Sequence, residues 1–554
     1  MALIDKASLL MVPSTYEAGK LYNVLPSGNR APDSTDQNSG YDQTRADFDF
    51  DRGSNTAATR VNADGLIEKY RENLLTESNN FSDSDWSNSG ISLTSGQEDP
   101  FGSNNAWRYL MSGSISASYL YQNNRTINAN AMVLSFWVKS NTDSSQTFRA
   151  TANSGSQSSP DFTATTEWKR FSWFFVSSSG NSNILLAYNP TTNVDLVIYG
   201  AQFEVGTIAT DYLDSTSVTG KAGVLVDLPR INYDANGENG SLLLEPSRTN
   251  LIPHSEWFGS GSGWSYFKNV SVGNFVLSPE GKMNATELVF DGTSGGRLER
   301  SISGLISGAD YSVSLYARVA SGTQEVFFGS FQDAPAVTLT TEWQRLEKTQ
   351  PENDTTAYPR IRCEDAATIE IYGFQHEAGS YPSSYIPNHS GTGGITRAAD
   401  SCTGGGDSDS INSTEGVAFI ECSFFADDVG ENRDFYISDG TATNRIRIRF
   451  SSSDVVNFLV YNGSVQADIN YTLPNPTNNN KIAVKWKAND FALWVNGTER
   501  GTDTSGTTFS TNTLDDVSFY TTYNQSQIFH SNVKQVAVFN EALSDSELAT
   551  LTTL

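Results

Sequence analysis

The stretch IYGAQFEVG at residues 198–206 decides the fold, because it returns as IYGFQHEAG at residues 371–379. Working outward from it, three earlier stretches are also repeated, in the same order and at a nearly constant spacing. The paired stretches are 73–78 with 250–255, 136–139 with 315–318, and 165–170 with 340–345. Ordered repeats of this kind predict a duplicated domain, and each copy is long enough to form its own hydrophobic core.

Both copies, and the chain that follows them, carry the pattern of β-strands. Apolar and polar residues alternate in MVLSFWVKS (132–140), YSVSLYARV (311–319) and RIRIRF (445–450), and β-branched and aromatic residues are frequent. Clusters of Gly, Asn, Asp and Ser separate such runs, as in sandwiches and barrels. The one good helix signal lies at the C-terminus, where Ser544 and Glu547 have capping-box spacing. The sequence therefore predicts an all-β protein with one short helix.

Three β-sandwiches in series are expected, preceded by a short N-terminal segment. Gly-rich residues 403–410 indicate a linker, and the pattern of predicted strands and turns after them differs from that of both copies. Residues 1–72 are too short and too polar for much of a core, so we expect an anchoring arm that orders only against a partner. The predicted boundaries are 1–72 for the arm, 73–215 for the first copy, 216–249 for a connector, 250–400 for the second copy and 408–554 for the third sandwich.

Composition limits the partners of this chain. It has 36 Lys and Arg against 63 Asp and Glu, which gives a net charge of −27, and no cluster of basic residues offsets this negative charge locally. Because such a charge repels phosphate and anionic lipid, we expect no nucleic-acid partner and no membrane insertion. Cys363, Cys402 and Cys422 have neither CxxC spacing nor a disulfide framework, and no secretory signal is evident. We therefore expect synthesis in a reducing cytoplasm.

The sequence offers little support for catalysis. Residues 292–296 fit G-x-S-x-G, but they lie among turn residues and not in the strand-turn-helix context that this motif requires. The four histidines are scattered without metal-ligand spacing. With 63 acidic residues, a pair of glycosidase carboxylates stays an open alternative. The repeated Glu204 and Glu377 are better explained by shared folding constraints, so we expect no enzyme and no catalytic residues.

Sugar binding needs flat aromatic faces beside polar groups. The predicted ligand contacts are Trp107, Tyr119 and Tyr121. They lie in polar strands, at positions that alternate with those expected to face the core. Four other tryptophans lie in apolar alternation and are expected in the core. They are Trp168, Trp343, Trp486 and Trp494.

Seven stretches of the first 400 residues resemble sequences of a known class of protein. They are 6–10, 19–22, 47–54, 58–68, 242–251, 381–387 and 396–400. In combination these stretches resemble tailed-bacteriophage virion proteins, usually described as tail fibre or carbohydrate-binding structural proteins. Gly53 stands where such proteins often carry Ala, and the first copy ends in Asp211-Tyr212-Leu213 without the prolines of the second. The resemblance implies that the two copies are jelly rolls like carbohydrate-binding modules.

The third sandwich resembles a laminin-G or concanavalin A-like domain. The resemblance rests on residues 491–497, where Asn-Gly between apolar residues is a strong hairpin signal, and on residues 533–548. Modules of both kinds often carry calcium, so a structural calcium is the one cofactor that we consider. The available acidic loops contain Asp407, Asp409, Asp427, Asp428, Asp515 and Asp516, none with EF-hand spacing.

Together these features predict a non-enzymatic virion fibre. Its N-terminal arm would bind other virion proteins, and its sandwiches would present surfaces for a host glycan or another host receptor. The resemblance implies a homotrimer on the virion surface, while tail fibre, head fibre and capsid decoration all stay open. We place the C-terminal sandwich at the outer end of the fibre. The alternatives are a virion-associated polysaccharide depolymerase and a purely structural spike.

Overall fold

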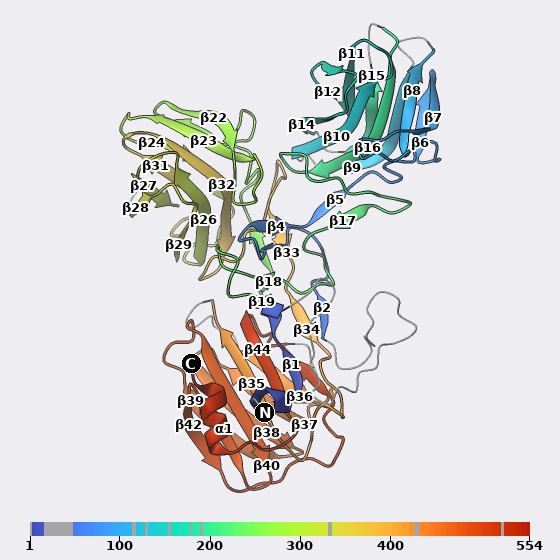
Figure 1. The fold of residues 1–554 in the computed structure, drawn as a ribbon. Coiled ribbons are helices and arrows are strands. Elements are labelled where there is room, and N and C mark those ends of the chain that lie inside the picture. Colours follow the sequence, from blue (N-terminus) through green and yellow to red (C-terminus); the bar gives the residue numbers. More distant parts are fainter. Residues whose placement is uncertain are drawn as a thin grey trace.

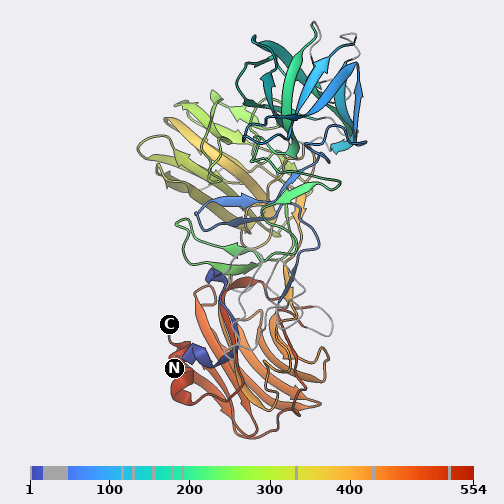
Figure 2. The same cartoon turned by 45° about the vertical axis from the view of Figure 1, so that its right-hand side comes forward.

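The computed structural model describes residues 3–15, 48–113, 118–127, 131–152, 157–177, 180–188, 192–330, 335–425, 432–521 and 526–554. Strands dominate, and three β-sandwiches follow one another along the chain, which confirms the predicted all-β class. Figure 1 shows the two repeats at one end and the C-terminal sandwich at the other, with short two-stranded sheets between them. The rotated view in Figure 2 shows the same separation.

The first repeat packs a five-stranded sheet on a six-stranded one. The five-stranded sheet has the order β14 (Lys169–Val176), β10 (Ala131–Ser140), β16 (Asp195–Val205), β8 (Ala106–Met111), β7 (Ile91–Gln97). The other contains β12 (Gln157–Ser158), β11 (Gln146–Ala152), β15 (Gly180–Tyr188), β9 (Tyr119–Ile127) and β6 (Trp86–Ser89), with β13 (Phe162–Ala164) paired to β11. Alternate residues of β10, such as Leu134, Phe136 and Val138, fill the core between the sheets.

The second repeat has the strand order of the first in one sheet and, apart from β12, in the other, as the predicted duplication requires. One sheet runs β22 (Val270–Val276), β23 (Ala285–Asp291), β32 (Ala366–Ala378), β26 (Asp310–Val319), β29 (Gln344–Pro351). The other runs β21 (Ser265–Phe267), β24 (Gly296–Glu299), β31 (Arg360–Cys363), β27 (Gln324–Gly329), β28 (Ala336–Leu339), and β25 (Ile302–Ser303) pairs with β30 (Thr356–Ala357). Even the register agrees, because Trp137 pairs with Tyr199 and Tyr316 with Tyr372, each beside an irregularity in the ladder.

The C-terminal sandwich combines an eight-stranded and a five-stranded sheet. The larger has the order β18 (Ile231–Asn232), β19 (Ser241–Leu244), β44 (Ser531–Phe539), β35 (Glu415–Ser423), β40 (Asn480–Lys487), β41 (Phe491–Val495), β42 (Thr498–Asp503), and β1 (Ala7–Met11) pairs with β44. The smaller has β39 (Val465–Thr472), β38 (Val455–Asn462), β37 (Asn444–Phe450), β36 (Arg433–Ser438), β43 (Asp516–Ser518). The predicted Asn496-Gly497 turn joins β41 to β42, and Ser544 caps α1 (Asp545–Thr552) through the predicted capping box.

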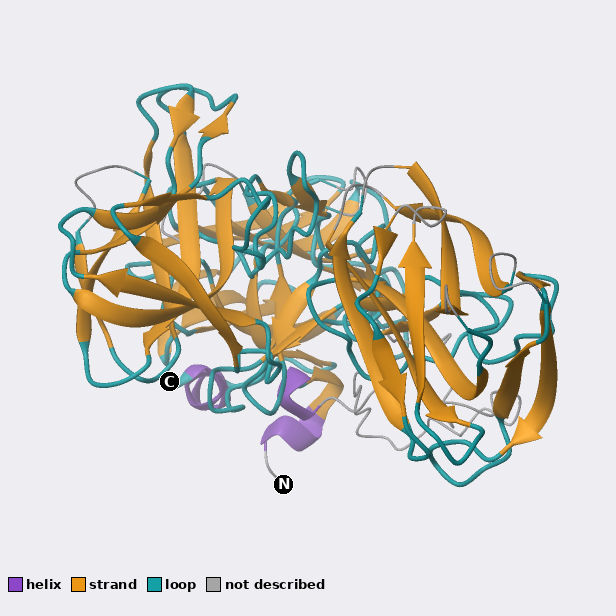
Figure 3. Cartoon of the chain, turned by 90° about the horizontal axis from the view of Figure 1, so that it is seen from above, coloured by secondary structure: helices purple, strands orange, loops and turns teal. Residues whose placement is uncertain are grey.

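The expectation that the N-terminal segment orders only against a partner is wrong for its described part. Leu9 and Met11 of β1 are buried in the core of the C-terminal sandwich. Lys6, in the 3-10 helix η1 (Leu3–Lys6), donates to Glu547 of α1 at 2.7 Å, and a second 3-10 helix, η2 (Pro13–Thr15), follows β1. Figure 3 shows the N-terminal and C-terminal helices side by side. Burial of the apolar side chains of β1 therefore orders this strand within the chain itself, although the segment around it is polar.

Two further expectations about the chain order need correction. The connector 216–249 supplies β18 and β19 to the C-terminal sheet. The Gly-rich linker 403–410 is packed, since Gly405 pairs with Val517 and leaves no room for a Cβ beside the ring of Phe48. Because β1 pairs with β44, an anchor near residues 7–11 would lie beside the C-terminal sandwich, while the position of this sandwich on a particle stays a prediction.

Short sheets and buried arginines join the repeats to this sandwich. The sheets are β2 (Asp49–Asp51) with β34 (Ser401–Thr403), β3 (Thr59–Val61) with β4 (Ile67–Lys69), β5 (Arg71–Asn73) with β17 (Gly220–Ala222), and β20 (Arg248–Asn250) with β33 (Ile395–Arg397). Arg230, with no exposed surface, lies 2.8 Å from Glu245 and also pairs with Asp400, while Arg397 binds Glu245. Burial acts to raise the pKa of Glu245, but the two guanidinium charges outweigh it and lower this pKa to about 2. The junction is thus a network of paired buried charges.

Candidate functional site

Four aromatic rings gather on the outer face of the first repeat, and we call them the aromatic platform: Phe101, Trp137, Tyr199 and Tyr212. Ring centroids lie 5.6 to 5.8 Å apart between Trp137 and each of the other three rings. Trp137 points outward because its neighbours on β10, Phe136 and Val138, point into the core. The platform therefore uses the face of the sheet that the core does not need.

A glycine makes the close packing of these rings possible. Gly200 has a φ of +60°, and a Cβ there would lie 3.1 Å from the ring of Trp137 and 3.2 Å from that of Tyr212. A side chain at this position would both strain the backbone and push the two rings apart. Gly200 thus fixes how the platform is assembled.

Polar groups surround the rings. The guanidinium of Arg170 lies 4.5 Å from the ring centroid of Trp137, and it donates to the carbonyl of Thr210 at 2.6 Å. The hydroxyl of Tyr212 lies 2.7 Å from Ser78 Oγ and donates to Asp214 at 2.9 Å. Burial lowers the pKa of Arg170 and raises that of Tyr212. The site therefore offers flat apolar faces beside a cation, a carboxylate and hydroxyls.

The platform is open to solvent at one prominent ring. Phe101 is 68% exposed, although it touches Trp137 and Tyr199, and both of those rings are half-buried. Its loop is ordered by Asp99, whose carboxylate accepts from the backbone N–H of Phe101 at 2.8 Å. A phenylalanine that keeps about two thirds of its surface exposed gains little stability from folding, so its ring is available for binding.

The second repeat carries tyrosines at the positions equivalent to Trp137, Tyr199 and Tyr212, but a hairpin covers them. Tyr316, Tyr372 and Tyr385 occupy the equivalent face, and Tyr372 and Tyr385 are fully buried beneath Ile67 of the β3–β4 hairpin. Lys69 of this hairpin donates to the tyrosine hydroxyl of Tyr372 at 3.1 Å. No such hairpin lies on the platform of the first repeat within the residues that the structure describes. One copy of the face is therefore closed and the other is open.

The predicted ligand contacts do not lie together. Tyr119 and Tyr121 point outward from β9, with Leu120 buried between them, and their ring centroids are 5.2 Å apart. Trp107 lies in the opposite sheet on the same side as Tyr109, packs against the core and donates to the carbonyl of Asn79 at 2.9 Å. The prediction from alternation is therefore wrong for Trp107, and a binding role for all three residues stays a prediction.

The tryptophans expected in the core divide into two pairs. Trp486 and Trp494 are buried in the C-terminal sandwich, as predicted. Trp168 and Trp343 are only half-buried, and each lies beneath a cation of the neighbouring strand, with Lys139 Nζ 5.0 Å from the first ring centroid. Their alternation places them on the outer face and not in the core.

The acidic loops show no assembled calcium site. Asp407 accepts from the backbone N–H groups of Asp409 and Ser410, which closes a turn. Asp516 is half-buried and accepts from Ser518 Oγ at 2.6 Å, and burial raises its pKa and that of Asp515. No group of three or more His, Cys, Asp or Glu among the described residues is placed to hold a metal ion. Asp427 and Asp428 lie outside the described residues, so calcium binding stays a prediction.

The repeated glutamates have a structural role. Glu204 accepts from Gln202 at 2.7 Å and from the N–H of Thr210 at 2.9 Å, and Glu377 makes the same contacts with Gln375 and Ser383. Burial raises the pKa of both glutamates. The three cysteines are buried free thiols.

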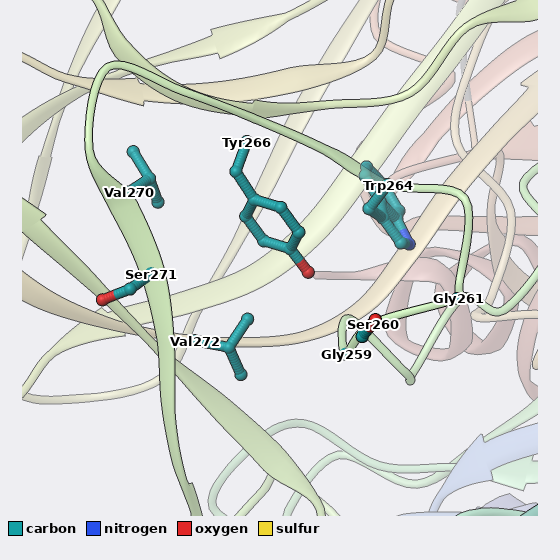
Figure 4. A pocket seen from close by; sticks show the side chains of 8 residues that line it. All are labelled: Gly259, Ser260, Gly261, Trp264, Tyr266, Val270, Ser271 and Val272. Carbon is teal, nitrogen blue, oxygen red and sulfur yellow. The ribbon is translucent and has the colours of Figure 1, made fainter.

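A separate pocket opens at the edge of the second repeat, with a volume of about 320 Å³ (Figure 4). Tyr266 lies at its centre, between Val272 on one side and Trp264 on the other, with its hydroxyl toward the loop of residues 259–261. The pocket is at the lower limit of ligand-sized cavities, and no charged side chain lines it. The platform of the first repeat thus has the richer chemistry.

Residues 424–549 match the family model of the concanavalin A-like lectin/glucanases superfamily. The expected resemblance of the C-terminal sandwich is confirmed for those residues. No curated protein matches the chain. Among the described helices, none has the length and apolar composition that a membrane crossing requires.

Solved structures with some likeness to the chain include two from carbohydrate-active enzymes. One is the CBM40 of a Ruminococcus gnavus IT-sialidase bound to alpha2,3 sialyllactose, at 17% identity, with 26% of this chain and 83% of that chain covered and a TM-score of 0.22. The other is the CBM22-1-CBM22-2 tandem domain of Paenibacillus barcinonensis Xyn10C, at 11% identity, with 59% and 96% covered and a TM-score of 0.24. At TM-scores this low, neither structure bears on the function of the chain.

Proposed function

We propose that this chain is a non-enzymatic glycan-binding fibre protein of a virion, and that the aromatic platform holds the sugar. The observation that carries the proposal is the ordered, 68% exposed Phe101 beside half-buried Trp137 and Tyr199. Flat rings accept the C–H faces of a sugar, while Arg170 and Asp214 are placed to bind its hydroxyls. The match of residues 424–549 to a superfamily of lectins and glucanases supports carbohydrate as the ligand class.

The virion role rests on the resemblance of the first 400 residues to phage fibre proteins. On that basis the chain binds other virion proteins near its N-terminus and forms a homotrimer on the particle surface. Since β1 lies in the C-terminal sandwich, we place this sandwich near the particle and the two repeats outward, the reverse of the order expected from the sequence. Multiple copies of the platform would then supply avidity to a weak single site.

Glycan-array binding by the full-length protein tests the ligand. We expect Trp137→Ala to reduce binding at least tenfold, or about 1.4 kcal/mol. Trp168→Ala is the matched control, because it removes a half-buried tryptophan outside the platform and should leave binding unchanged. An array without any bound glycan would favour a purely structural spike.

Catalysis is tested with the same protein. Incubation with host capsule polysaccharide should release no reducing ends above the level of a heat-denatured control. Steady release would refute the non-enzymatic part of the proposal and favour a depolymerase.

A further inference from the structure

The run RIRIRF on β37 places three arginines on one face of the smaller C-terminal sheet. Ile446, Ile448 and Phe450 point into the core and are at most 3% exposed. Arg445, Arg447 and Arg449 alternate with them, so their side chains leave the opposite face at intervals of about 6.7 Å. Sequence composition hides this row, because the arginines are separated by apolar residues.

One of the three arginines is neutralised within the fold. Arg449 donates to both carboxylate oxygens of Asp434, at 2.6 and 2.7 Å. Asp434 has no exposed surface and also accepts from Thr521 at 2.6 Å, so its carboxylate is already paired within the fold. This end of the row is structural.

The other two arginines have no carboxylate partner among the described residues. Arg447 donates to the neutral amide oxygen of Asn457 at 2.5 Å, and Arg445 to the carbonyl of Ala442. The guanidinium of Arg445 also stacks 4.2 Å from the ring centroid of Tyr461. In both arginines Nε is buried and has no hydrogen-bond acceptor. Burial, followed by the like charge of Arg449, lowers the pKa of Arg447, while the charge of Asp434 and a hydrogen bond with Tyr436 act in the opposite direction.

Two carboxylates lie on this face two strands away from the arginines, one on each side. Asp516 of β43 is in register with Arg445 and accepts from Ser518 Oγ, and Asp468 of β39 is in register with Arg447. Asp468 on β39 is exposed, and it is held by the amide of Asn457 at 2.5 Å. Asn457 therefore lies between Arg447 and Asp468 and keeps them from pairing directly. The face therefore carries two guanidinium groups without a salt bridge, flanked by two carboxylates, in a protein of net charge −27.

We propose that Arg445 and Arg447 bind the anionic groups of an acidic polysaccharide. Guanidinium forks bind carboxylate and sulfate with two parallel hydrogen bonds, and Tyr461 keeps the fork of Arg445 oriented. A nucleic acid fits less well, because such partners need many more phosphate contacts to overcome the net charge of the chain. This site lies in a different domain from the aromatic platform and does not depend on it.

Binding of defined polymers to the full-length protein tests the site. The probes are polygalacturonate, dextran sulfate and uncharged dextran, measured by biolayer interferometry at low and physiological salt. We expect binding of at least one polyanion and none of dextran, and the preferred polyanion distinguishes carboxylate from sulfate. The double variant R445Q/R447Q should weaken this binding at least tenfold.

Matched variants separate the site from general charge effects. Arg500→Gln removes another arginine of the same sandwich that stacks on a tyrosine, and it should change the affinity less than twofold. Trp137→Ala should have no effect here, so failure of this site and failure of the platform are distinguishable. If the Gln variant does not fold, R445K/R447K keeps the charge but not the forks and should still bind severalfold more weakly. Absence of polyanion binding, equal loss with Arg500→Gln, or equally tight binding of a DNA oligonucleotide would overturn the proposal.

Discussion

Lys69 fastens the hairpin that closes the second repeat, so Lys69→Met should open it. Lys69 Nζ lies 2.9 Å from Glu256 Oε1 and 2.8 Å from Glu280 Oε2, and Glu256 has no exposed surface. Burial acts to raise the pKa of Glu256, but the charge of Lys69 and then that of His389 hold it below its usual value. Removing the lysine leaves a buried carboxylate without its nearest cation.

The cost of this change follows from the burial. Breaking a buried ion pair from one side costs about 3–5 kcal/mol, and two tyrosine hydroxyls that still donate to Glu256 favour the lower end of this range. About 3 kcal/mol corresponds to a roughly hundredfold larger open population of the hairpin. Because the pKa of Glu256 is depressed in the folded state, the contribution of this pair is complete above about pH 4.5 and is lost as the pH falls through the folded pKa.

Amide hydrogen exchange measures the opening directly. The N–H of Ile67 donates to the carbonyl of Pro279 at 2.9 Å across the covered face, so it reports on the hairpin. We expect its exchange at pH 7 to be about a hundredfold faster in Lys69→Met. Lys221→Met, which removes an exposed lysine 3.9 Å from Glu72, is the control and should change exchange very little. A change of less than tenfold for Ile67 would refute the reasoning.

Three further perturbations test other parts of the fold. Gly373→Ala, at a φ of +66° with a tyrosine ring 3.1 Å from the new Cβ, should destabilise the second repeat by about 1–3 kcal/mol. Gly322→Ala, with a similar φ but open space, should cost less in the same urea titration, and equal costs would contradict the packing argument. His376→Phe leaves the buried Glu352 without its partner at 3.6 Å and should speed amide hydrogen exchange in β29. Adding Glu352→Ser to this variant should slow the exchange again. Exchange that stays fast in the double variant would contradict the pairing. Hydrogen bonds from Lys6 of η1 and then from Ser544 lower the pKa of Glu547 to about 2. Docking of η1 on α1 should therefore weaken as the pH falls from about 4.5 to 2 and stay unchanged above that range. Amide hydrogen exchange in α1 measures this docking.

Local features of the fold could be predicted because each rests on a short-range pattern. The alternation in β37, the Asn496-Gly497 turn and the capping box of α1 all involve neighbours in the sequence. The duplication could also be predicted, since the repeated residues make the same contacts in both copies. An example is Asn73, whose amide donates to two carbonyls as that of Asn250 does.

Long-range pairing and the binding face could not be predicted in this way. Residues 7–11 form a short apolar stretch in the sequence, but nothing local predicts that it pairs with a strand at the other end of the chain. Trp137 is flanked by apolar residues on β10 and so has the same local pattern as a core tryptophan. Phe101 lies in a loop, where no periodicity exists to indicate which way a ring points. Only the comparison of an open face with a covered one distinguishes the platform.

The pairing of β1 with β44 sets the order of events during synthesis. Ser8 donates to the carbonyl of Val538, which lies 530 residues later in the chain. At 5–20 residues per second, a ribosome needs about 25–100 s to deliver that partner, while the two repeats finish and fold meanwhile. Throughout this interval Leu9 and Met11 have no β44 to pair with, so the nascent chain carries an unpaired apolar segment. A chaperone that holds this segment would therefore be needed only until β44 has been made.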